Sequence, residues 1–196
     1  MPVAGTSMTN LIDSYLLFRI RTKQDPEAFA RIYDRYVEAI FRFAVLKLPT
    51  REEAQDVTAE TFTRAWQYVS EHPDVGNIRA LLYRIARNLV ADHYRRTHGM
   101  VSLDAVTIDQ SGASTPYEEP GDKGREQLIV EARADLALVL RQLERLKEDY
   151  RDVLMLRLVD DLPFGVIAEV LGKTPGNVRV IYHRAIKALN ETEPNP

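Results

Sequence analysis

The sequence predicts an all-α protein of two small helical modules joined by a flexible, acidic linker. Apolar residues recur every three or four positions, as on one face of a helix, both before residue 98 and after residue 125. No stretch alternates apolar and polar residues as a half-buried β-strand does. Residues 98–124 contain four glycines, three serines and five acids against one lysine, and their apolar residues have no period.

Length and composition are those of a globular protein of one or two domains. The chain has 196 residues, of which 45% are hydrophobic and 28% charged. It has no cysteine, which excludes disulfides and thiolate metal sites. No apolar run approaches the roughly 18 residues of a membrane span, and the first ten residues do not have the pattern of a signal peptide. We therefore expect a cytoplasmic protein without membrane insertion.

The first module is expected to contain four helices, preceded by a mobile segment over residues 1–10. Residues 11–23 predict a short, mostly apolar helix. The next helix begins with an N-cap, a proline at the first helical position and an acid in the first turn, which are Asp25, Pro26 and Glu27. This second helix is expected to end before Pro49.

Capping residues also mark the third and fourth helices. Thr50 and Glu53 have the spacing of a capping box, which starts a third helix that runs to Trp66 or Val69. A His-Pro pair ends that helix, and Asn77 can cap a fourth helix over residues 78–96.

The fourth helix is expected to have one aliphatic face and one face rich in arginine and tyrosine. The second face includes Tyr83, Arg84, Arg87, Tyr94 and Arg95. Such a face suits a groove that follows a nucleic-acid backbone and offers rings for stacking on bases. Alternatively, the tyrosines pack on a neighbouring helix and the arginines are solvated, and the pattern taken alone favours this second interpretation.

Residues 162–189 predict two helices joined by a tight turn. Gly172 suits the left-handed residue that follows a helix end. Thr174 and Pro175 then supply an N-cap and a proline at the first helical position. Two helices joined by a short turn that contains glycine are typical of a helix-turn-helix.

The second helix of this pair separates its apolar and basic residues onto opposite faces. The face without acids comprises Arg179, Val180, His183, Arg184 and Lys187, and Lys173 precedes the helix. Such a helix suits a major groove, where its N-terminal half reads base edges and flanking cations meet phosphates. The alternative is a solvated basic face, but the turn residues together with the absence of acids favour DNA binding.

These features together resemble bacterial RNA polymerase sigma factors of the extracytoplasmic-function (ECF) type, in the major sigma family. "EEAQDVTAETFTRAW" (52–66) resembles the family's core-polymerase-binding helix, and "ALLYRIARNLVADHYRR" (80–96) resembles its promoter-melting and minus-ten helix. Residues 143–189 resemble the region that reads the minus-thirty-five element. The usual Glu and Gln of the core-binding helix are Gln55 and Ala59 here.

The resemblance implies a region 2-like domain over residues 11–97, a linker over 98–125, a region 4-like domain over 126–190 and a tail over 191–196. The implied partners are promoter DNA and core RNA polymerase, bound through the clamp helices of its largest subunit and through its flap. Most family members are also held by an anti-sigma factor. The implied function is to direct the polymerase to specific promoters and to help melt the DNA for initiation.

The resemblance also implies three groups of binding residues. Those for core polymerase are Asp56, Thr58, Glu60, Phe62 and Trp66. Those for the melted minus-ten element are Gly76, Asn77, Tyr83, Arg84, Arg87, Asn88, Tyr94, Arg95 and Arg96. Those for the upstream element are Lys173, Thr174, Asn177, Arg179, Val180, His183, Arg184 and Lys187.

Two other classes of function fit the sequence less well. A helix-turn-helix regulator would bind a palindromic duplex without polymerase, and the core-binding motif argues against it. An enzyme is disfavoured because the four histidines are scattered and no phosphate-binding loop or nucleophile motif occurs. We therefore expect no catalytic residue, no metal and no cofactor.

Overall fold

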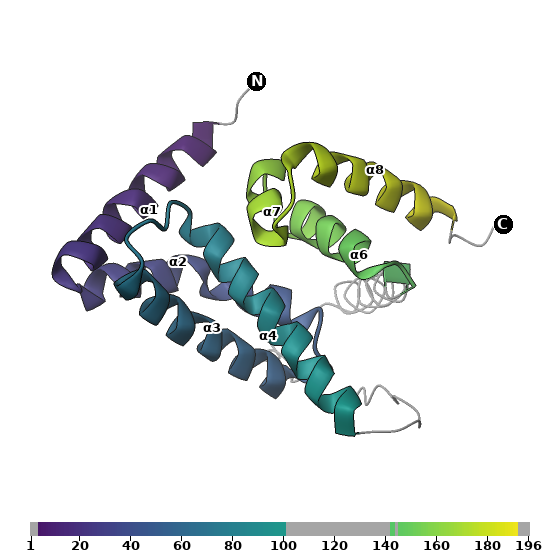
Figure 1. Ribbon diagram of the computed structural model, residues 1–196, viewed down its shortest axis with the longest axis horizontal. Helices are drawn as coiled ribbons and strands as arrows, with labels where there is room; N and C mark the ends of the chain where they lie inside the picture. Colours follow the sequence, from purple (N-terminus) through teal and green to yellow (C-terminus); the bar gives the residue numbers. More distant parts are fainter. Residues whose placement is uncertain (1–3, 101–141, 144, 192–196) are drawn as a thin grey trace, which may run out of the picture. The chain divides into compact units, whose positions relative to one another are not determined.

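The computed structural model describes residues 4–100, 142–143 and 145–191, and in these ranges every regular element is a helix (Figure 1). The elements are α1 (Ala4–Lys23), α2 (Pro26–Val45), α3 (Arg51–Glu71), α4 (Ile78–Met100), α6 (Glu148–Leu154), the π-helix η1 (Met155–Val159), α7 (Phe164–Leu171) and α8 (Pro175–Glu191). The prediction of an all-α protein is confirmed. None of the described helices is both long and apolar enough to cross a membrane.

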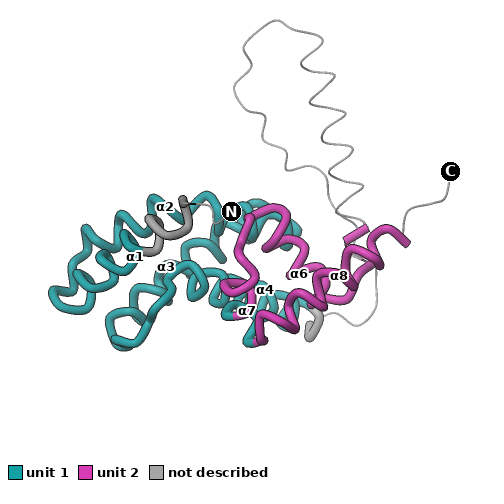
Figure 2. Tube along the Cα trace, turned by 90° about the horizontal axis from the view of Figure 1, so that it is seen from above, with its two compact units in different colours: residues 1–108, 169–172 teal, residues 109–168, 173–196 magenta. Residues whose placement is uncertain are grey.

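The chain separates into two compact units (Figure 2). One comprises residues 1–108 and 169–172, and the other comprises residues 109–168 and 173–196. The expected linker falls mostly outside the described residues, as does the first part of the expected C-terminal domain. The first three residues of the expected linker, 98–100, belong to α4.

The predicted caps start the helices of the first unit. The carboxylate of Asp25 accepts hydrogen bonds from the backbone N–H groups of Glu27 and Ala28, at 3.0 and 3.3 Å. In the capping box of α3, the Glu53 N–H donates to the Thr50 hydroxyl at 3.2 Å, and the Thr50 N–H donates to the Glu53 carboxylate at 3.1 Å. These bonds satisfy N–H groups that have no partner within the helix.

Three helix boundaries differ from prediction. Helix α1 begins at Ala4, so most of the segment expected to be mobile is helical. Helix α3 continues to Glu71, and α4 continues past Arg96 to Met100. The start of α4 agrees with prediction, because the Asn77 side-chain oxygen accepts a hydrogen bond from the Ala80 N–H at 3.1 Å.

The core of the first unit lies among α1–α4, with α2, α3 and α4 packed against one another (Figure 1). Its fully buried side chains include Ile32, Ile40, Phe43, Leu82 and Tyr83. The rings of Phe43 on α2 and Tyr83 on α4 meet edge to face, with centroids 5.5 Å apart. Full burial of one large apolar side chain of this kind stabilises the fold by roughly 1.5–3 kcal/mol.

A buried carboxylate joins α1 to α2 in this unit. Asp13 is only 6% exposed. It accepts hydrogen bonds from the Tyr36 hydroxyl and from Arg35 Nη1, the latter at 3.2 Å. Burial raises the pKa of Asp13 above its ordinary value, because the charged form is poorly solvated there, although the hydrogen bonds and the nearby arginines oppose the shift.

The second unit contains α6, η1, the first part of α7 (residues 164–168) and α8, and α6 packs along α8. Its buried side chains include Leu154, Leu156, Leu162, Ile167 and Val178. The π-helix follows α6 directly, and the Leu162 N–H after it donates to the Leu156 carbonyl at 2.9 Å.

The turn between α7 and α8 has the predicted geometry. Gly172 adopts a left-handed conformation with φ of 63°. The next N–H, that of Lys173, donates to the Ala168 carbonyl of α7 at 2.9 Å. The Thr174 hydroxyl accepts from the Asn177 N–H at 3.2 Å, and Pro175 is the first residue of α8. The helix-turn-helix is thus closed by a left-handed glycine and an N-cap.

Candidate nucleic-acid interfaces

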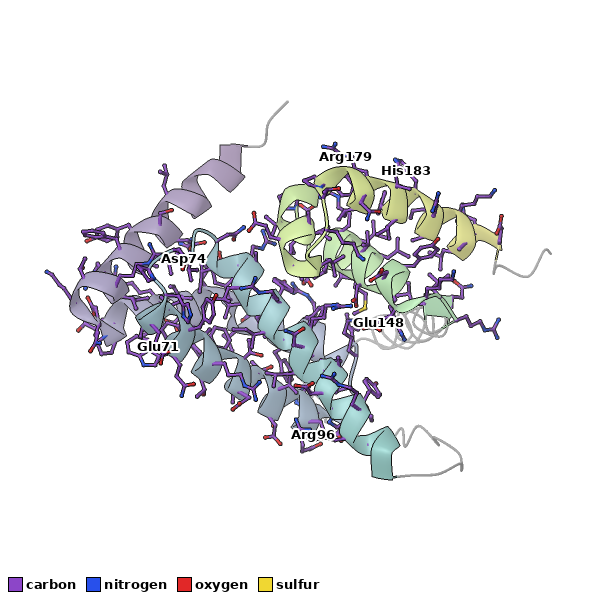
Figure 3. All side chains as sticks on the ribbon, in the orientation of Figure 1. Glu71, Asp74, Arg96, Glu148, Arg179 and His183 are labelled. Atoms are coloured by element: carbon purple, nitrogen blue, oxygen red, sulfur yellow. The ribbon has the colours of Figure 1, made fainter. Side chains whose placement is uncertain are left out.

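The outer face of α8 is exposed as predicted. Val178, Ile181 and Ala185 are buried on the opposite side. The exposed residues are Arg179, Val180, His183, Arg184 and Lys187. Figure 3 shows Arg179 and His183 projecting from the same side of α8, away from α6. This face presents cations along a helix whose N-terminal end is free of acids.

Arg179, the first cation on this face, contacts an aromatic ring of the neighbouring helix α7. The guanidinium carbon of Arg179 lies 5.8 Å from the centre of the Phe164 ring, on α7. The same ring meets the ring of Tyr182 at 5.4 Å and the guanidinium of Arg157 at 5.3 Å. Cation–π contacts of this kind are worth about 0.5–1 kcal/mol at exposed sites. The sequence does not predict this role of Phe164, because the contact joins two helices and has no periodic signal.

Two of the predicted phosphate-binding lysines have acidic neighbours. Lys173 Nζ lies 3.0 Å from a carboxylate oxygen of Asp149, near the start of α6. Lys187 Nζ lies 3.8 Å from a carboxylate oxygen of Glu191, and both of those side chains are exposed. Exposed pairs are worth about 0–1 kcal/mol, so a phosphate can replace the carboxylate at Lys187, whereas Lys173 is half-buried.

Helix α4 presents most of its predicted binding residues to solvent. Exposed residues are Arg84, Asn88, Tyr94, Arg95 and Arg96, and Arg87 is half-buried. Arg95 pairs with the Asp92 carboxylate one turn earlier. The Tyr94 hydroxyl donates to the Lys47 carbonyl, so this exposed ring is anchored at its tip.

Tyr83 is a correction to the sequence-based expectation, because its side chain is fully buried. It was predicted on the exposed side of α4, but it packs against Phe43 of α2. Helix α4 contacts both α2 and α3, so its buried face is wider than a single apolar stripe. In this conformation the ring cannot stack on a base.

The predicted base-binding loop connects α3 to α4. Gly76 is exposed, and a Cβ added there would meet no atom within 4 Å. Asn77 is half-buried and caps α4. The guanidinium of Arg21, on α1, donates to the Val75 carbonyl and so fixes the loop to a third helix.

The predicted polymerase-binding residues of α3 divide into surface and core. Asp56 is exposed and Glu60 is half-buried, where it accepts a hydrogen bond from Arg64 Nε at 2.6 Å. Thr58 and Phe62 are only 5% and 4% exposed. The Thr58 hydroxyl donates to the Ala54 carbonyl at 2.7 Å, which allows a polar residue to be buried there.

Phe62 belongs to an aromatic cluster between α2 and α3. Its ring centre lies 4.7 Å from that of Tyr33 and 6.4 Å from that of Phe29. Phe29 in turn meets the half-buried Trp66 edge to face at 5.1 Å. The expectation that Thr58 and Phe62 touch a partner directly is therefore wrong for this conformation, since both are already covered by the fold.

A groove of about 330 Å³ runs between α3 and α4. Its polar lining comprises Glu53, Asp56 and Glu60 on α3 and His93, Arg96 and Thr97 on α4. His93 Nε2 lies 3.5 Å from a Glu53 carboxylate oxygen. The described residues contain no group of three or more histidines and acids placed to hold a metal ion.

Comparison with known proteins gives matches in both units. The chain matches the family models "Sigma-70 region 2" over residues 32–99 and "Sigma-70, region 4" over residues 136–189. The ECF RNA polymerase sigma factor SigW of Bacillus subtilis is 31% identical over 172 residues, which are 86% of this chain and 90% of SigW. The ECF sigma factor BldN of Streptomyces coelicolor is 29% identical over 172 residues, which are 87% of this chain and 62% of BldN.

A solved structure shares the fold. It is that of CnrH in complex with the cytosolic domain of CnrY, with a TM-score of 0.66 at 23% sequence identity. The match covers 92% of this chain and 96% of that chain.

Proposed function

The chain belongs to the ECF RNA polymerase sigma factors, and on that premise we propose that it binds core RNA polymerase, directs it to specific promoters and helps melt the DNA for initiation. It acts in the cytoplasm as a subunit of the polymerase and is not itself an enzyme. The observation that carries the proposal is the basic outer face of α8, which has no acid between Pro175 and Lys187 and follows the left-handed turn at Gly172. Helix α8 thus suits the major groove of duplex DNA. The same chain carries a second helical unit with basic residues on α4.

The helix-turn-helix reads the upstream element as duplex DNA. Arg179, Val180 and His183 stand on the N-terminal half of the outer face of α8, the part of a recognition helix that reaches base edges. Thr174 and Asn177 hold the start of that helix in place. Lys173, Arg184 and Lys187 contact phosphates, which strengthens binding at every sequence.

Helix α4 and the loop before it hold the melted minus-ten element. Arg84, Arg87, Asn88, Arg95 and Arg96 lie along the backbone of the single strand, and Tyr94 offers an exposed ring for stacking. The open space at Gly76 supports the passage of a base next to the loop, with Asn77 at its edge. Extruding a base costs a few kcal/mol, which these contacts offset.

Helix α3 binds the clamp helices of the polymerase through its surface acids, and the second unit binds the flap. Asp56 and Glu60 make the direct contacts, because they reach solvent. The buried side chains of Thr58 and Phe62 pack beneath this surface, and Trp66 lies at the edge of the aromatic cluster. An anti-sigma factor is a further partner, as the anti-sigma factor NepR is the partner of the sigma factor RpoE in a solved complex from Bartonella quintana that shares the fold.

A transcription assay tests the proposal. Purified core polymerase is given a library of random promoters, with and without this protein, and transcripts are sequenced. We expect transcripts that start only when the protein is present, downstream of one enriched motif of two blocks. Tight binding to a duplex palindrome without any core-dependent transcript would instead identify a conventional helix-turn-helix regulator.

Two variants of α8 separate base reading from phosphate binding. Arg179→Ala should relax the preference at one upstream base pair, at a cost of about 1–3 kcal/mol for the preferred base. Arg184→Ala should weaken all promoters alike and reduce the slope of log affinity against log salt by about 0.9. If the two variants give the same sequence profile, the assignment of these roles is wrong.

A further inference from the structure

Val180 is an apolar side chain on a face otherwise made of polar and basic residues. It lies on the outer side of α8, 46% exposed. Arg179, His183 and Arg184 are its exposed neighbours on that face. A valine is a weaker helix former than alanine, lysine or arginine, so an exposed valine does not help to stabilise the helix.

The backbone of α8 leaves the Val180 methyl groups uncovered. Side chains of a helix lean toward its N-terminus, so the side chain of Val180 lies over the position of residue 176, one turn earlier. That residue is Gly176, and nothing lies within 4 Å of the place where its Cβ would be. A flat base edge can therefore approach the isopropyl group from the N-terminal end of the helix.

We propose that Val180 reads the 5-methyl group of one thymine in the upstream promoter element, an inference that rests on the proposed function. In the major groove only thymine offers a methyl group, and apolar side chains contact it. The other base edges present hydrogen-bonding groups there, which would lose water against a valine without gaining a partner. The same side chain thus favours thymine and disfavours the alternatives at that base pair.

Deoxyuridine provides a test, since it differs from thymidine only by the missing methyl group. The upstream block enriched in the transcription assay is synthesised with each of its thymines replaced singly by deoxyuridine. Initiation by core polymerase with this protein is then measured on each template. We expect one position where the replacement lowers initiation about fourfold, the effect of one buried methyl-sized group.

Two valine variants show whether Val180 causes this difference. Val180→Ser removes both methyl groups and should abolish the preference for thymidine over deoxyuridine at that position. Serine and valine have similar helix propensities, so the variant keeps α8 intact. The matched control is Val159→Ser on η1, where a valine of similar exposure (43%) lies outside α8. The Val159→Ser variant should show the same ratio of initiation on thymidine and deoxyuridine templates as the wild type.

The possible outcomes separate the inference from its premise. An active polymerase that responds equally to thymidine and deoxyuridine at every upstream position would overturn the role of Val180 alone. A preference that persists in Val180→Ser would do the same. No core-dependent transcript at all would overturn the proposed function, and this inference with it.

Discussion

Replacement of Phe62 by alanine should destabilise the first unit, because its ring is 4% exposed and contacts both Tyr33 and Phe29. Truncation of a buried phenylalanine to alanine costs about 3–5 kcal/mol. A unit of this size has a total stability of about 5–15 kcal/mol. The variant therefore loses a large share of its folding free energy even though the motif around Phe62 resembles a partner-binding helix.

The loss of folding free energy can be measured through the fluorescence of the single tryptophan of the chain, Trp66. Trp66 lies in the same aromatic cluster, 5.1 Å from Phe29, so its fluorescence reports the unfolding of this unit. With a urea m-value of about 2 kcal/mol/M, a loss of about 4 kcal/mol lowers the unfolding midpoint by about 2 M. Phe62→Leu keeps most of the volume and should lower it by less than half as much.

Gln67→Ala is the matched control, since Gln67 is exposed on the same helix and should leave the midpoint almost unchanged. The reasoning would be refuted if Phe62→Ala kept the wild-type midpoint but lost affinity for core polymerase. That result would mean that Phe62 contacts the polymerase directly and contributes little to the fold.

Three further substitutions test local interactions. Thr50→Ala removes one half of the capping box of α3 and should cost about 1 kcal/mol, read from the fluorescence midpoint. Gly172→Ala puts a Cβ on a left-handed residue, which costs about 1–2 kcal/mol, so the melting temperature by circular dichroism should fall although no atom lies within 4 Å of the added carbon. Because the fold raises the pKa of Asp13, the stability that its protonated form provides is complete below the ordinary value of 3.8 and is lost as the pH rises through the raised value. Asp13→Asn should remove this loss, so the urea midpoints of wild type and variant should diverge as the pH rises above the ordinary pKa of 3.8. Unchanged midpoints for Thr50→Ala, an unchanged melting temperature for Gly172→Ala, or parallel pH profiles for the Asp13 pair would contradict the respective argument.

Helix starts and the turn of the helix-turn-helix could be predicted because they depend on neighbours in sequence. Asp25, Thr50, Asn77 and Thr174 each cap a helix within three residues of themselves, and Gly172 supplies a backbone conformation that other residues avoid. The outer face of α8 was equally predictable, since one partner surface leaves the opposite side exposed.

The errors arise where several helices cover one another. Tyr83 and Phe62 are buried by contacts with α2, a different helix from their own, and helical spacing does not reveal which sides of a helix are covered. The contact between Phe164 and Arg179 also joins two helices. The π-helix η1 arises from a change in the hydrogen-bonding pattern of a few residues, which leaves no mark on apolar periodicity.

Burial also changes what the family resemblance of α3 means. Among the residues that match the family's core-binding motif, Val57, Thr58 and Phe62 are buried. Their identity with the motif therefore preserves packing within the unit. The two departures, Gln55 and Ala59, are both exposed and lie one helical turn apart. This chain therefore keeps the fold of the family's helix while altering the surface that we propose for the polymerase. Its affinity for core polymerase, rather than its stability, is the property in which we expect these departures to set it apart from its relatives.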